Sequence, residues 1–312
     1  MHVVTVGGSG QIGRALIERL SAGQDEVTNL GRGHGNFLGK TQHIQWHLGQ
    51  PVPREVRRSK PEMFVFLAAQ TDPGRALVHR VDESRSLVAG FVRLLDEVTE
   101  FAPDSIFVLT GSATEVGGLD AHSIGTWSPL QPTTFYDTVK ACQALYLEQF
   151  TQSGLIRGRV IRLAHVYGGW TDERDQRGFI NRTMVRALRG QTLEFRSDRR
   201  YHRDYVHIDD VVEAIICCKS LKENPTPLSY VLGTGTLTSV EKAVHLISRF
   251  AADEFGVVPA KIHRIREPTA PGIEWRSAKV EMGNLEGPSV HKPVVSFPEG
   301  IELSMRRLAE RL

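Results

Sequence analysis

The sequence has 312 residues, of which 40% are hydrophobic and 24% charged, which is ordinary for a globular protein with a sizeable core in one or two domains. Lys and Arg number 38 and Asp and Glu 36. The formal net charge of +2 therefore gives no argument for a nucleic-acid partner or a membrane surface.

The cysteines are Cys142, Cys217 and Cys218. An odd number with two adjacent residues is no disulfide framework, and no second Cys/His pair has the spacing of a metal site, so we expect a reducing compartment and no metal. The N-terminus lacks the pattern of a signal peptide, and no window approaches the ~20 apolar residues of a membrane span. We therefore expect a cytoplasmic protein.

The N-terminus predicts a strand, a tight turn and a helix. Val3–Val6 is a β-branched run, and glycines then follow in a G-x-x-G-x-x-G spacing before an apolar helical pattern. Such a turn presents free N–H groups to an anion, most naturally a pyrophosphate. An ordinary βα turn is the alternative. The predicted cofactor contacts here are Gly7, Gly10, Gln11, Ile12 and Gly13.

The second predicted strand, Glu26–Leu30, ends in Gly31 and Arg32. Dinucleotide folds that prefer NAD usually carry Asp or Glu here, to bind the ribose hydroxyls. A small residue followed by a guanidinium leaves room for a 2′-phosphate and supplies its charge partner. We therefore expect NADP(H) rather than NAD(H), with Gly31 and Arg32 as cofactor contacts; a solvated loop role for Arg32 is the alternative.

Two further strands are predicted at His43–Leu48 and Met63–Ala69. His47 and Leu48 are candidate cofactor contacts, although His47 is equally read as a surface histidine. The second run is near-continuously apolar, as in a central parallel strand. Its end would lie against the cofactor through Leu67, Ala68 and Ala69. Leu87–Val98 has the amphipathic spacing of a helix that packs in the core or in a dimer interface.

The strand predicted at Ser105–Leu109 leads into Thr110 and Ser112, and a long helix is predicted to open with Tyr136 and to contain Lys140. The i, i+4 spacing places the phenol and the ammonium on one helix face, where a cation lowers the phenol pKa. Ser112, at the end of a strand, would hydrogen-bond the substrate oxygen with which the phenol exchanges a proton. These are the predicted catalytic residues; Thr110, Tyr136 and Lys140 are also predicted cofactor contacts. A structural tyrosine is the alternative.

Taken together, the motifs resemble the extended short-chain dehydrogenase/reductases, specifically the nucleotide-sugar epimerase/dehydratase group. The match spans nearly the whole chain. The motifs are Gly7-x-x-Gly10-x-x-Gly13, Leu67-Ala68-Ala69, Ser112-Ala113-Thr114 with Gly117, Tyr136-x-x-x-Lys140, Arg162-Leu163-Ala164-His165-Val166-Tyr167-Gly168 and Arg203-Asp204-Tyr205-Val206-His207-Ile208-Asp209-Asp210.

The resemblance implies an α/β fold with a doubly wound parallel sheet and a smaller C-terminal substrate lobe. Residues 1–168 with about 204–235 would bind the dinucleotide, and residues 169–203 and 236–312 would bind a nucleotide sugar. A homodimer is implied in the same way. Asp209 and Asp210 begin an amphipathic segment, which suggests helix capping rather than catalysis.

Several positions depart from the group's pattern. The acidic pair that its dehydratases carry after the catalytic hydroxyl is Ala113 and Thr114 here, and Glu115 lies one position late, so it should point elsewhere. This argues against 4,6-dehydration, which needs an acid and a base beside the sugar. The usual asparagine before Tyr-Gly is His165, a predicted cofactor contact for which a substrate contact and a cap on a strand end are the alternatives. Leu87 replaces another asparagine, implying a different local hydrogen bond.

In the lobe, the resemblance assigns nucleotide-sugar contacts to Phe179, Asn181, Arg203 and Arg276. Arg203 would grip the diphosphate, for which a planar fork is suited. Lys279 stands where relatives place an acid. A solvated charge run fits Arg199 and Arg200 better than it fits Arg203.

The run from Arg162 to Arg203, with Trp275-Arg276-Ser277 later, resembles the 4-ketoreductases of deoxysugar biosynthesis. This resemblance implies an NADPH-dependent reductase of a nucleotide-activated 4-keto-6-deoxyhexose. The Gly31-Arg32 ending suits the phosphorylated, reducing pool, and net reduction requires cofactor exchange. The alternatives are a nucleotide-sugar 4-epimerase that retains NAD, and a non-catalytic dinucleotide sensor, although sensors usually lack the Tyr/Lys pair that is intact here.

Overall fold

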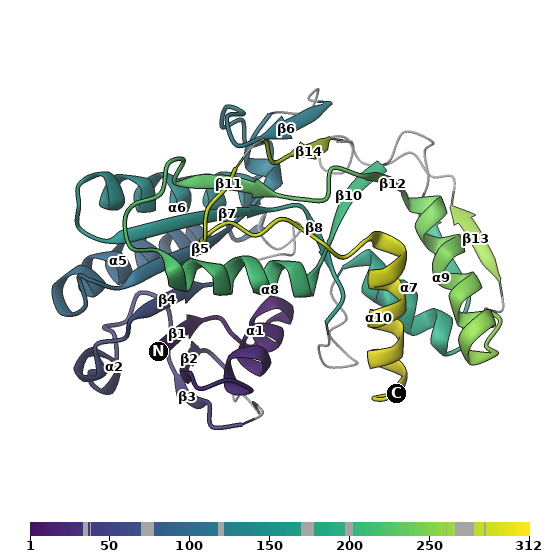
Figure 1. The fold of residues 1–312 in the computed structure, drawn as a ribbon, viewed down its shortest axis with the longest axis horizontal. Helices are drawn as coiled ribbons and strands as arrows, with labels where there is room; N and C mark the ends of the chain where they lie inside the picture. Colours follow the sequence, from purple (N-terminus) through teal and green to yellow (C-terminus); the bar gives the residue numbers. More distant parts are fainter. Residues whose placement is uncertain are drawn as a thin grey trace.

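The computed structural model describes residues 1–33, 37, 39–69, 78–117, 122–169, 178–196, 202–259, 261–265, 278–283 and 285–312. A seven-stranded sheet with strand order β11-β7-β5-β4-β1-β2-β3 forms its centre, and every pairing in it is parallel (Figure 1). Its strands are β1 His2–Val6, β2 Glu26–Gly31, β3 Gln42–Gln45, β4 Met63–Phe66, β5 Ile106–Ser112, β7 Arg157–Leu163 and β11 Ser229–Leu232.

The sheet confirms the expected doubly wound α/β fold. The chain leaves β1 toward β2 and β3 on one side and then returns to β4 on the other, so the strand order reverses at β1. Crevices at such reversals, beyond the carboxyl ends of the strands, are where open α/β sheets bind ligands. The predicted glycine turn follows β1 at this point.

Helices cover both faces of the sheet, as the alternation of strand side chains requires. Val3 packs in a core with α1 and α8, whereas Val4 packs in a second core with α5 and α6. The helices are α1 Gln11–Ser21, α2 Arg54–Ser59, α4 Arg80–Glu83, α5 Gly90–Phe101, α6 Phe135–Gln152, α7 Phe179–Leu188, α8 Ile208–Cys217, α9 Val240–Phe255 and α10 Phe297–Ala309.

Several predicted boundaries differ from the structure; the strand predicted at Met63–Ala69, for example, ends at Phe66. The third strand is Gln42–Gln45 and not His43–Leu48, because the chain turns where Trp46 enters the core. The helix predicted from Leu87 begins as a π-helical segment, Ser84–Ala89, and becomes α-helical only at Gly90. A π-helical turn is rare and does not follow the 3.6-residue apolar spacing from which the helix was predicted.

Helices α7, α9 and α10 gather at one end of the sheet and share a separate apolar core (Figure 1). Short strands adjoin them: β8 His165–Tyr167, β10 His202–His207 and β12 Leu237–Ser239 form a three-stranded sheet, and β9 Leu193–Arg196 pairs with β13 Ile262–Ile265. This third core, formed by α7, α9 and α10, is consistent with the predicted substrate lobe. The residue bounds of the two predicted domains stay a prediction.

One part of the predicted lobe returns to the main sheet. Strand β14, Lys279–Glu281, pairs with β6, Ser123–Gly125, and Val280 is buried beside Val231. Farther along, Ser289 accepts a hydrogen bond from buried Arg159 at 2.8 Å. The chain therefore crosses back along the sheet between β13 and α10, which the apolar pattern of this short segment gave no means of predicting.

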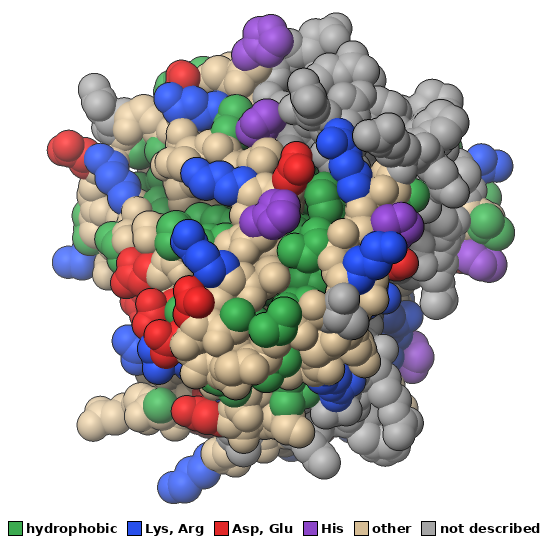
Figure 2. Space-filling view, turned by 90° about the vertical axis from the view of Figure 1, so that its right-hand side faces the viewer, with side chains coloured by type: hydrophobic (Ala, Val, Ile, Leu, Met, Phe, Trp, Pro, Cys, Tyr) green, Lys and Arg blue, Asp and Glu red, His purple; other side chains and the backbone are tan. Residues whose placement is uncertain are grey.

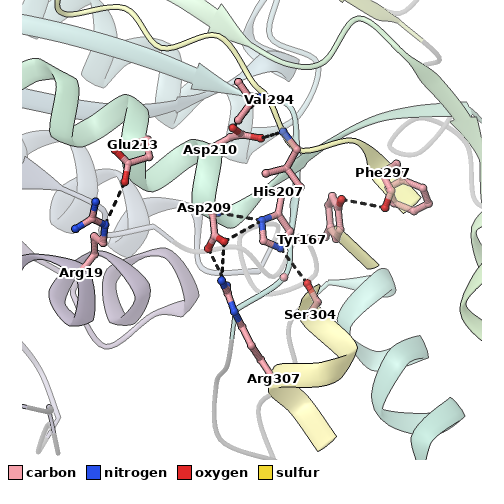
Figure 3. A network of polar contacts seen from close by, with 12 residues as sticks. Arg19, Tyr167, His207, Asp209, Asp210, Glu213, Val294, Phe297, Ser304 and Arg307 are labelled. Carbon is pink, nitrogen blue, oxygen red and sulfur yellow. Dashed lines mark hydrogen bonds and ion pairs between the residues drawn. The ribbon is translucent and has the colours of Figure 1, made fainter. Parts of the chain in front are cut away.

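A polar network joins α8, which packs in the core that contains Val3, to α10 of the third core (Figure 3). Fully buried His207 caps α8 and bonds Ser304 of α10 at 3.0 Å, while Arg307 of α10 makes two bonds to Asp209. Asp210 accepts the backbone N–H groups of 294 and 295. Both aspartates therefore hold the C-terminal segment as well as lying in the first turn of α8.

The face formed by the C-terminal lobe carries acidic and basic side chains, and neither sign covers it (Figure 2). Within the described residues, no helix is both long and apolar enough to cross a membrane. The same part of the chain holds no group of three or more His, Cys, Asp or Glu side chains placed to bind a metal ion.

Candidate active site

The glycine turn after β1 is shaped by close backbone approaches. Gly7 has a φ of +86°, and a Cβ there would lie 2.9 Å from the backbone of Ala68. A Cβ on Gly13 would lie 2.4 Å from Gly8, so the third glycine packs α1 against the turn. Gly10 is the N-cap of α1, and a Cβ on it would have its nearest neighbour, the Gly7 carbonyl oxygen, at 3.7 Å. The turn therefore leaves the start of α1 open to a ligand and fits a dinucleotide pyrophosphate.

Asn29 fixes this turn from beneath, a role that the sequence interpretation missed. Its side chain is fully buried, and its Oδ1 accepts hydrogen bonds from Gly8 N at 2.8 Å and Thr5 Oγ1 at 3.0 Å. Its Nδ2 meets His43 Nδ1 at 2.9 Å. The available signal was a polar amide inside the otherwise apolar run of β2, where burial demands partners.

The end of β2 lies beside the first residues of the next loop. Gly31 is buried, Arg32 is exposed, and Gln45 Nε2 donates to the Arg32 carbonyl at 3.2 Å. A Cβ on Gly31 would lie 3.3 Å from the Asn29 amide nitrogen, so the backbone is tightly packed there. His47 is exposed just beyond β3 and Leu48 is half-buried. No described contact assigns His47 to either of its two predicted roles.

The structure brings the three predicted catalytic residues together. Ser112 ends β5, and Tyr136 lies in the first turn of α6, whose N-cap Thr134 forms a capping box with Asp137. The Ser112 hydroxyl lies near enough to the Tyr136 phenol to lower its pKa. One turn later, buried Lys140 donates from Nζ to the Thr110 carbonyl at 2.8 Å. Strand end and helix start therefore converge on one phenol.

The charge balance at this phenol differs from the sequence expectation. Burial, then the Glu115 and Asp137 carboxylates, raise the pKa of Tyr136, and the nearby Ser112 hydroxyl only partly opposes them. Burial lowers the pKa of Lys140 to about 8. The predicted lowering of the Tyr136 pKa by Lys140 is therefore not what the isolated chain shows, because the ammonium is directed to the Thr110 carbonyl.

The Glu115 carboxylate is bonded to protein groups on both of its oxygens. It accepts the Ser112 backbone N–H at 2.5 Å and pairs with Arg162 Nε at 2.9 Å, with the carboxylate fully buried. Burial raises the Glu115 pKa and the nearby guanidinium works against that rise. Glu115 therefore braces the strand end and is not an acid placed on a substrate.

A largely apolar pocket opens beside Tyr136 and Lys140. Its other lining residues are Ala68, Ala69, Arg80, Glu83, Ser84, Leu87, Phe135, Val139 and Gln143. Leu67, the first residue of the predicted 67–69 run, does not line this pocket and instead packs against the core under α1. The Leu87 carbonyl accepts a hydrogen bond from Gln143 Nε2 at 2.7 Å. A backbone carbonyl is present whatever the side chain, so the different hydrogen bond expected at Leu87 stays a prediction.

The lobe residues behave differently from one another. Asn181 is 1% exposed, and its amide is bonded to both the N–H and the carbonyl of Gly168. That carbonyl also accepts Gln11 Nε2 at 2.5 Å. Asn181 therefore holds the loop after β8, and its substrate contact stays a prediction.

The structure shows where other predicted ligand-binding residues lie, but no contact tests their predicted roles. Phe179 is half-buried at the start of α7, and Arg203 is half-buried in β10, where it donates to the His202 carbonyl at 3.2 Å. His165 is exposed in β8, with its ring 6.0 Å from that of Tyr205. Arg276, together with Arg199 and Arg200, lies outside the described residues.

Comparison with known proteins places the chain in a family. The model of the NAD dependent epimerase/dehydratase family matches residues 3–233. The chain belongs to this family. The match covers the glycine turn, Ser112, Tyr136, Lys140 and Arg203, which are the motifs from which the resemblance was stated.

Individual relatives of this epimerase/dehydratase are distant. It is 27% identical over 227 residues to the UDP-glucose 4-epimerase of Mycolicibacterium smegmatis, covering 69% of this chain and 72% of that protein. Its fold resembles UDP-glucose 4-epimerase of Thermotoga maritima, solved with UDP-glucose, with a TM-score of 0.85, 22% identity and coverage of 100% and 99%. The complex of Thermus thermophilus UDP-glucose 4-epimerase with NAD gives a TM-score of 0.78, 23% identity and full coverage of both chains.

Proposed function

We propose that this family member transfers hydride between a nicotinamide cofactor and a ring carbon of a nucleotide-activated hexose. The observation that carries the proposal is the convergence of Ser112, Tyr136 and Lys140 beside a pocket at the carboxyl edge of the sheet. When bound, the nicotinamide supplies or accepts the hydride. The glycine turn and the open start of α1 are shaped to hold its pyrophosphate.

Each catalytic side chain has one task in this proposal. Tyr136 gives its phenolic proton to the oxygen of a substrate carbonyl, on which negative charge grows as the carbon is reduced. Ser112 orients that oxygen. Lys140, fixed through its bond to Thr110, holds the nicotinamide ribose and supplies positive charge next to the phenolate left on Tyr136. A non-catalytic sensor would not need these three side chains to lie together.

For the direction of reaction we propose net reduction of a nucleotide-activated 4-keto-6-deoxyhexose with NADPH. The supporting feature is the end of β2, where Gly31 and exposed Arg32 replace the carboxylate that binds ribose hydroxyls in NAD-preferring folds. A second feature is Ala113, which is buried, and Thr114, which stand where dehydratases of this group carry two acids.

A nucleotide-sugar 4-epimerase that retains NAD is the second candidate. It is favoured by the relatives above, which are named UDP-glucose 4-epimerases, one of them solved with NAD. The same Ser112, Tyr136 and Lys140 would serve it, because epimerisation at a ring carbon also passes through a ketone. The two candidates differ in whether cofactor is consumed.

Incubation of the purified chain with NADPH and a nucleotide-activated 4-keto-6-deoxyhexose separates them. Stoichiometric loss of the reduced-nicotinamide absorbance, with formation of the 4-hydroxy sugar, supports net reduction. Conversion of UDP-glucose to its 4-epimer by protein carrying its own NAD, without added cofactor, supports epimerisation and rejects the reductase. Failure of both reactions at saturating ligand contradicts the proposed function.

We also propose a homodimer. Exposed apolar side chains lie on α4 and α6, namely Val81 at 66%, Leu145 at 47% and Tyr146 at 43% exposure. Light scattering of the chain in solution should give twice the monomer mass, and replacement of Leu145 and Tyr146 by serine should restore the monomer. A monomeric wild-type chain at assay concentration would contradict this proposal.

A further inference from the structure

An arginine of α1 lies beside the glycine turn and faces the segment that follows β2. Arg14 is half-buried, and its Nε donates to the Ser9 carbonyl at 3.1 Å. Its guanidinium carbon lies 5.9 Å from the centroid of the Phe37 ring, which packs against the core under α1. An aromatic face attracts a guanidinium at this distance. A hydrogen bond and a ring contact therefore hold the Arg14 side chain between the turn and Phe37.

Further contacts connect Arg14 to the residue pair at the end of β2. The Phe37 ring lies 5.6 Å from the His43 ring, and His43 Nε2 donates to the Gly33 carbonyl. Gly33 directly follows Arg32, which was predicted from the sequence to contact the cofactor. A continuous set of contacts therefore leads from the first turns of α1, across two rings, to the segment that carries Arg32.

Both guanidinium groups have hydrogen-bond donors to offer a ligand. A guanidinium carries five N–H groups, and Arg14 uses only its Nε on Ser9. Within the described part of the chain, no carboxylate pairs with Arg14 or with exposed Arg32. Glu18, one turn after Arg14 on α1, is instead paired with Arg311 at 3.6 Å. The terminal nitrogens of Arg14 are therefore available to an anion.

The charge of this part of the sequence has one sign. No Asp or Glu occurs between Glu26 and Glu55, whereas Arg32 and exposed Lys40 both lie in that interval. The first turn of α1 also lacks an acidic side chain. Cations that gather without a carboxylate among them attract an anionic ligand, and a phosphate fits the planar fork of a guanidinium.

We propose that Arg14 is a further specificity-determining residue, which binds the adenosine 2′-phosphate of NADPH together with Arg32. This inference rests on the proposed function and deepens it. A dinucleotide whose pyrophosphate lies at the start of α1 directs its adenosine ribose to the end of β2. Arg14 lies between these two places. NADH carries a neutral hydroxyl where NADPH carries the phosphate, so the Arg14 charge distinguishes the two cofactors.

The hydrogen bond to Ser9 gives Arg14 an alternative role as a support for the glycine turn. The two roles differ in their effect on cofactor affinity. Support of the turn acts on the pyrophosphate, which NADPH and NADH share, so its loss weakens both cofactors by the same factor. A contact with the 2′-phosphate acts on NADPH alone. The ratio of the two dissociation constants therefore separates the roles.

Arg14→Gln is the test variant, and Arg19→Gln is its matched control. Both remove one positive charge from α1, but Arg19 is exposed and pairs with Glu213 of α8 at 3.2 Å. Glutamine at position 14 keeps an amide that can bond the Ser9 carbonyl. We expect the preference for NADPH over NADH, measured by nicotinamide fluorescence, to fall about tenfold or more in Arg14→Gln. Arg19→Gln should keep the wild-type preference.

A second probe removes the nicotinamide altogether. Calorimetric titration with adenosine 2′,5′-bisphosphate and with adenosine 5′-monophosphate compares ligands that differ only in the 2′-phosphate. We expect Arg14→Gln to weaken the bisphosphate by about the same factor and to leave the monophosphate within about threefold of the wild type. Arg14→Lys is the second variant if Arg14→Gln folds poorly. It keeps the charge without the fork, so the preference should fall by about threefold.

Two results would overturn the inference: a wild-type chain that does not prefer NADPH, or a folded Arg14 variant whose NADPH to NADH ratio matches the wild type. Equal weakening of both cofactors is the second of these results and assigns Arg14 to support of the turn. Absence of keto-sugar reduction by a wild type that binds NADPH would instead reject the proposed function. The two dissociation constants would still decide the role of Arg14.

Discussion

Glu115 and Arg162 form an ion pair of 2.9 Å in the interior, with side-chain exposures of 0% and 4%. Around it the end of β5 is tightly built: a Cβ on Gly111 would lie 2.7 Å from the Glu115 carboxylate. Arg162 also donates to Ser229 Oγ at 2.6 Å. The pair therefore links the strand that presents Ser112 to the neighbouring strands β7 and β11.

Glu115→Gln should destabilise the protein strongly, because it leaves the buried Arg162 guanidinium with only the more distant Glu148 carboxylate, at 3.5 Å. We expect a loss of about 3–5 kcal/mol in the free energy of unfolding, measured by chemical denaturation. Arg93→Gln, which breaks a half-exposed pair with Glu97, serves as the control and should cost about 1 kcal/mol or less. Equal losses in the two variants would contradict the buried-pair argument.

Asn29→Ala should weaken cofactor binding as well as the stability of the fold. It strands the buried Gly8 N–H and the Thr5 hydroxyl, at a cost of about 1–3 kcal/mol in the free energy of unfolding. The freed turn should also bind NADPH less tightly, as measured by the fluorescence of the bound nicotinamide. Thr28→Val, one residue earlier and 1% exposed, is the control: its NADPH affinity should stay at the wild-type value. A wild-type affinity in Asn29→Ala would be the contrary result.

How far the sequence predicts this site depends on the range of each contact. The glycine turn, the buried strands and the Tyr136–Lys140 spacing are local patterns, so their structures were predictable to within a few residues. Asn29 holds Gly8, which lies 21 residues earlier, and Glu115 pairs with Arg162, which lies 47 residues later. Such partners are set by strand register, which no local period reveals.

The phenol illustrates the same limit in electrostatics. Helical spacing correctly placed Tyr136 and Lys140 on one face, and that spacing alone predicted a lowered phenol pKa. Burial and two carboxylates, one of them brought in by the end of β5, reverse the direction. Asn181 shows a related limit, because nothing local in the sequence predicts that its amide is bonded to the N–H and the carbonyl of Gly168.

His207→Gln should change how stability depends on pH. Burial lowers the pKa of His207 below 6.5. The unfolded chain therefore binds a proton that the folded chain does not, so stability is present above pH 6.5 and is lost as the pH falls toward the folded-state pKa. The network of Figure 3, which joins α8 to α10, should weaken with it.

Glutamine at position 207 retains an amide able to bond Ser304 but carries no titrating group. We expect its free energy of unfolding, from denaturant titrations at a series of pH values below neutrality, to fall less steeply than that of the wild type. Parallel curves for the two proteins would show that His207 does not cause the acid sensitivity.

Arg32→Asp should reverse the choice of cofactor. A guanidinium bonded to the 2′-phosphate contributes about 1.5–3 kcal/mol, so NADPH affinity should fall at least tenfold, while NADH affinity should rise as the carboxylate meets the ribose hydroxyls. Dissociation constants for both cofactors, measured on the wild type and the variant, provide the check. An unchanged NADPH to NADH ratio would assign Arg32 to the solvated loop and would favour the NAD-retaining epimerase.

The central claim is that Tyr136 exchanges a proton with the substrate oxygen during hydride transfer. Tyr136→Phe removes one hydroxyl and keeps the ring, so the most direct measurement is turnover of this variant with a nucleotide-activated keto sugar, beside NADPH binding by the same protein. We predict that kcat falls by about 10²–10⁴-fold while the NADPH dissociation constant stays within about threefold of the wild type. Turnover at the wild-type rate by the folded variant would contradict the account.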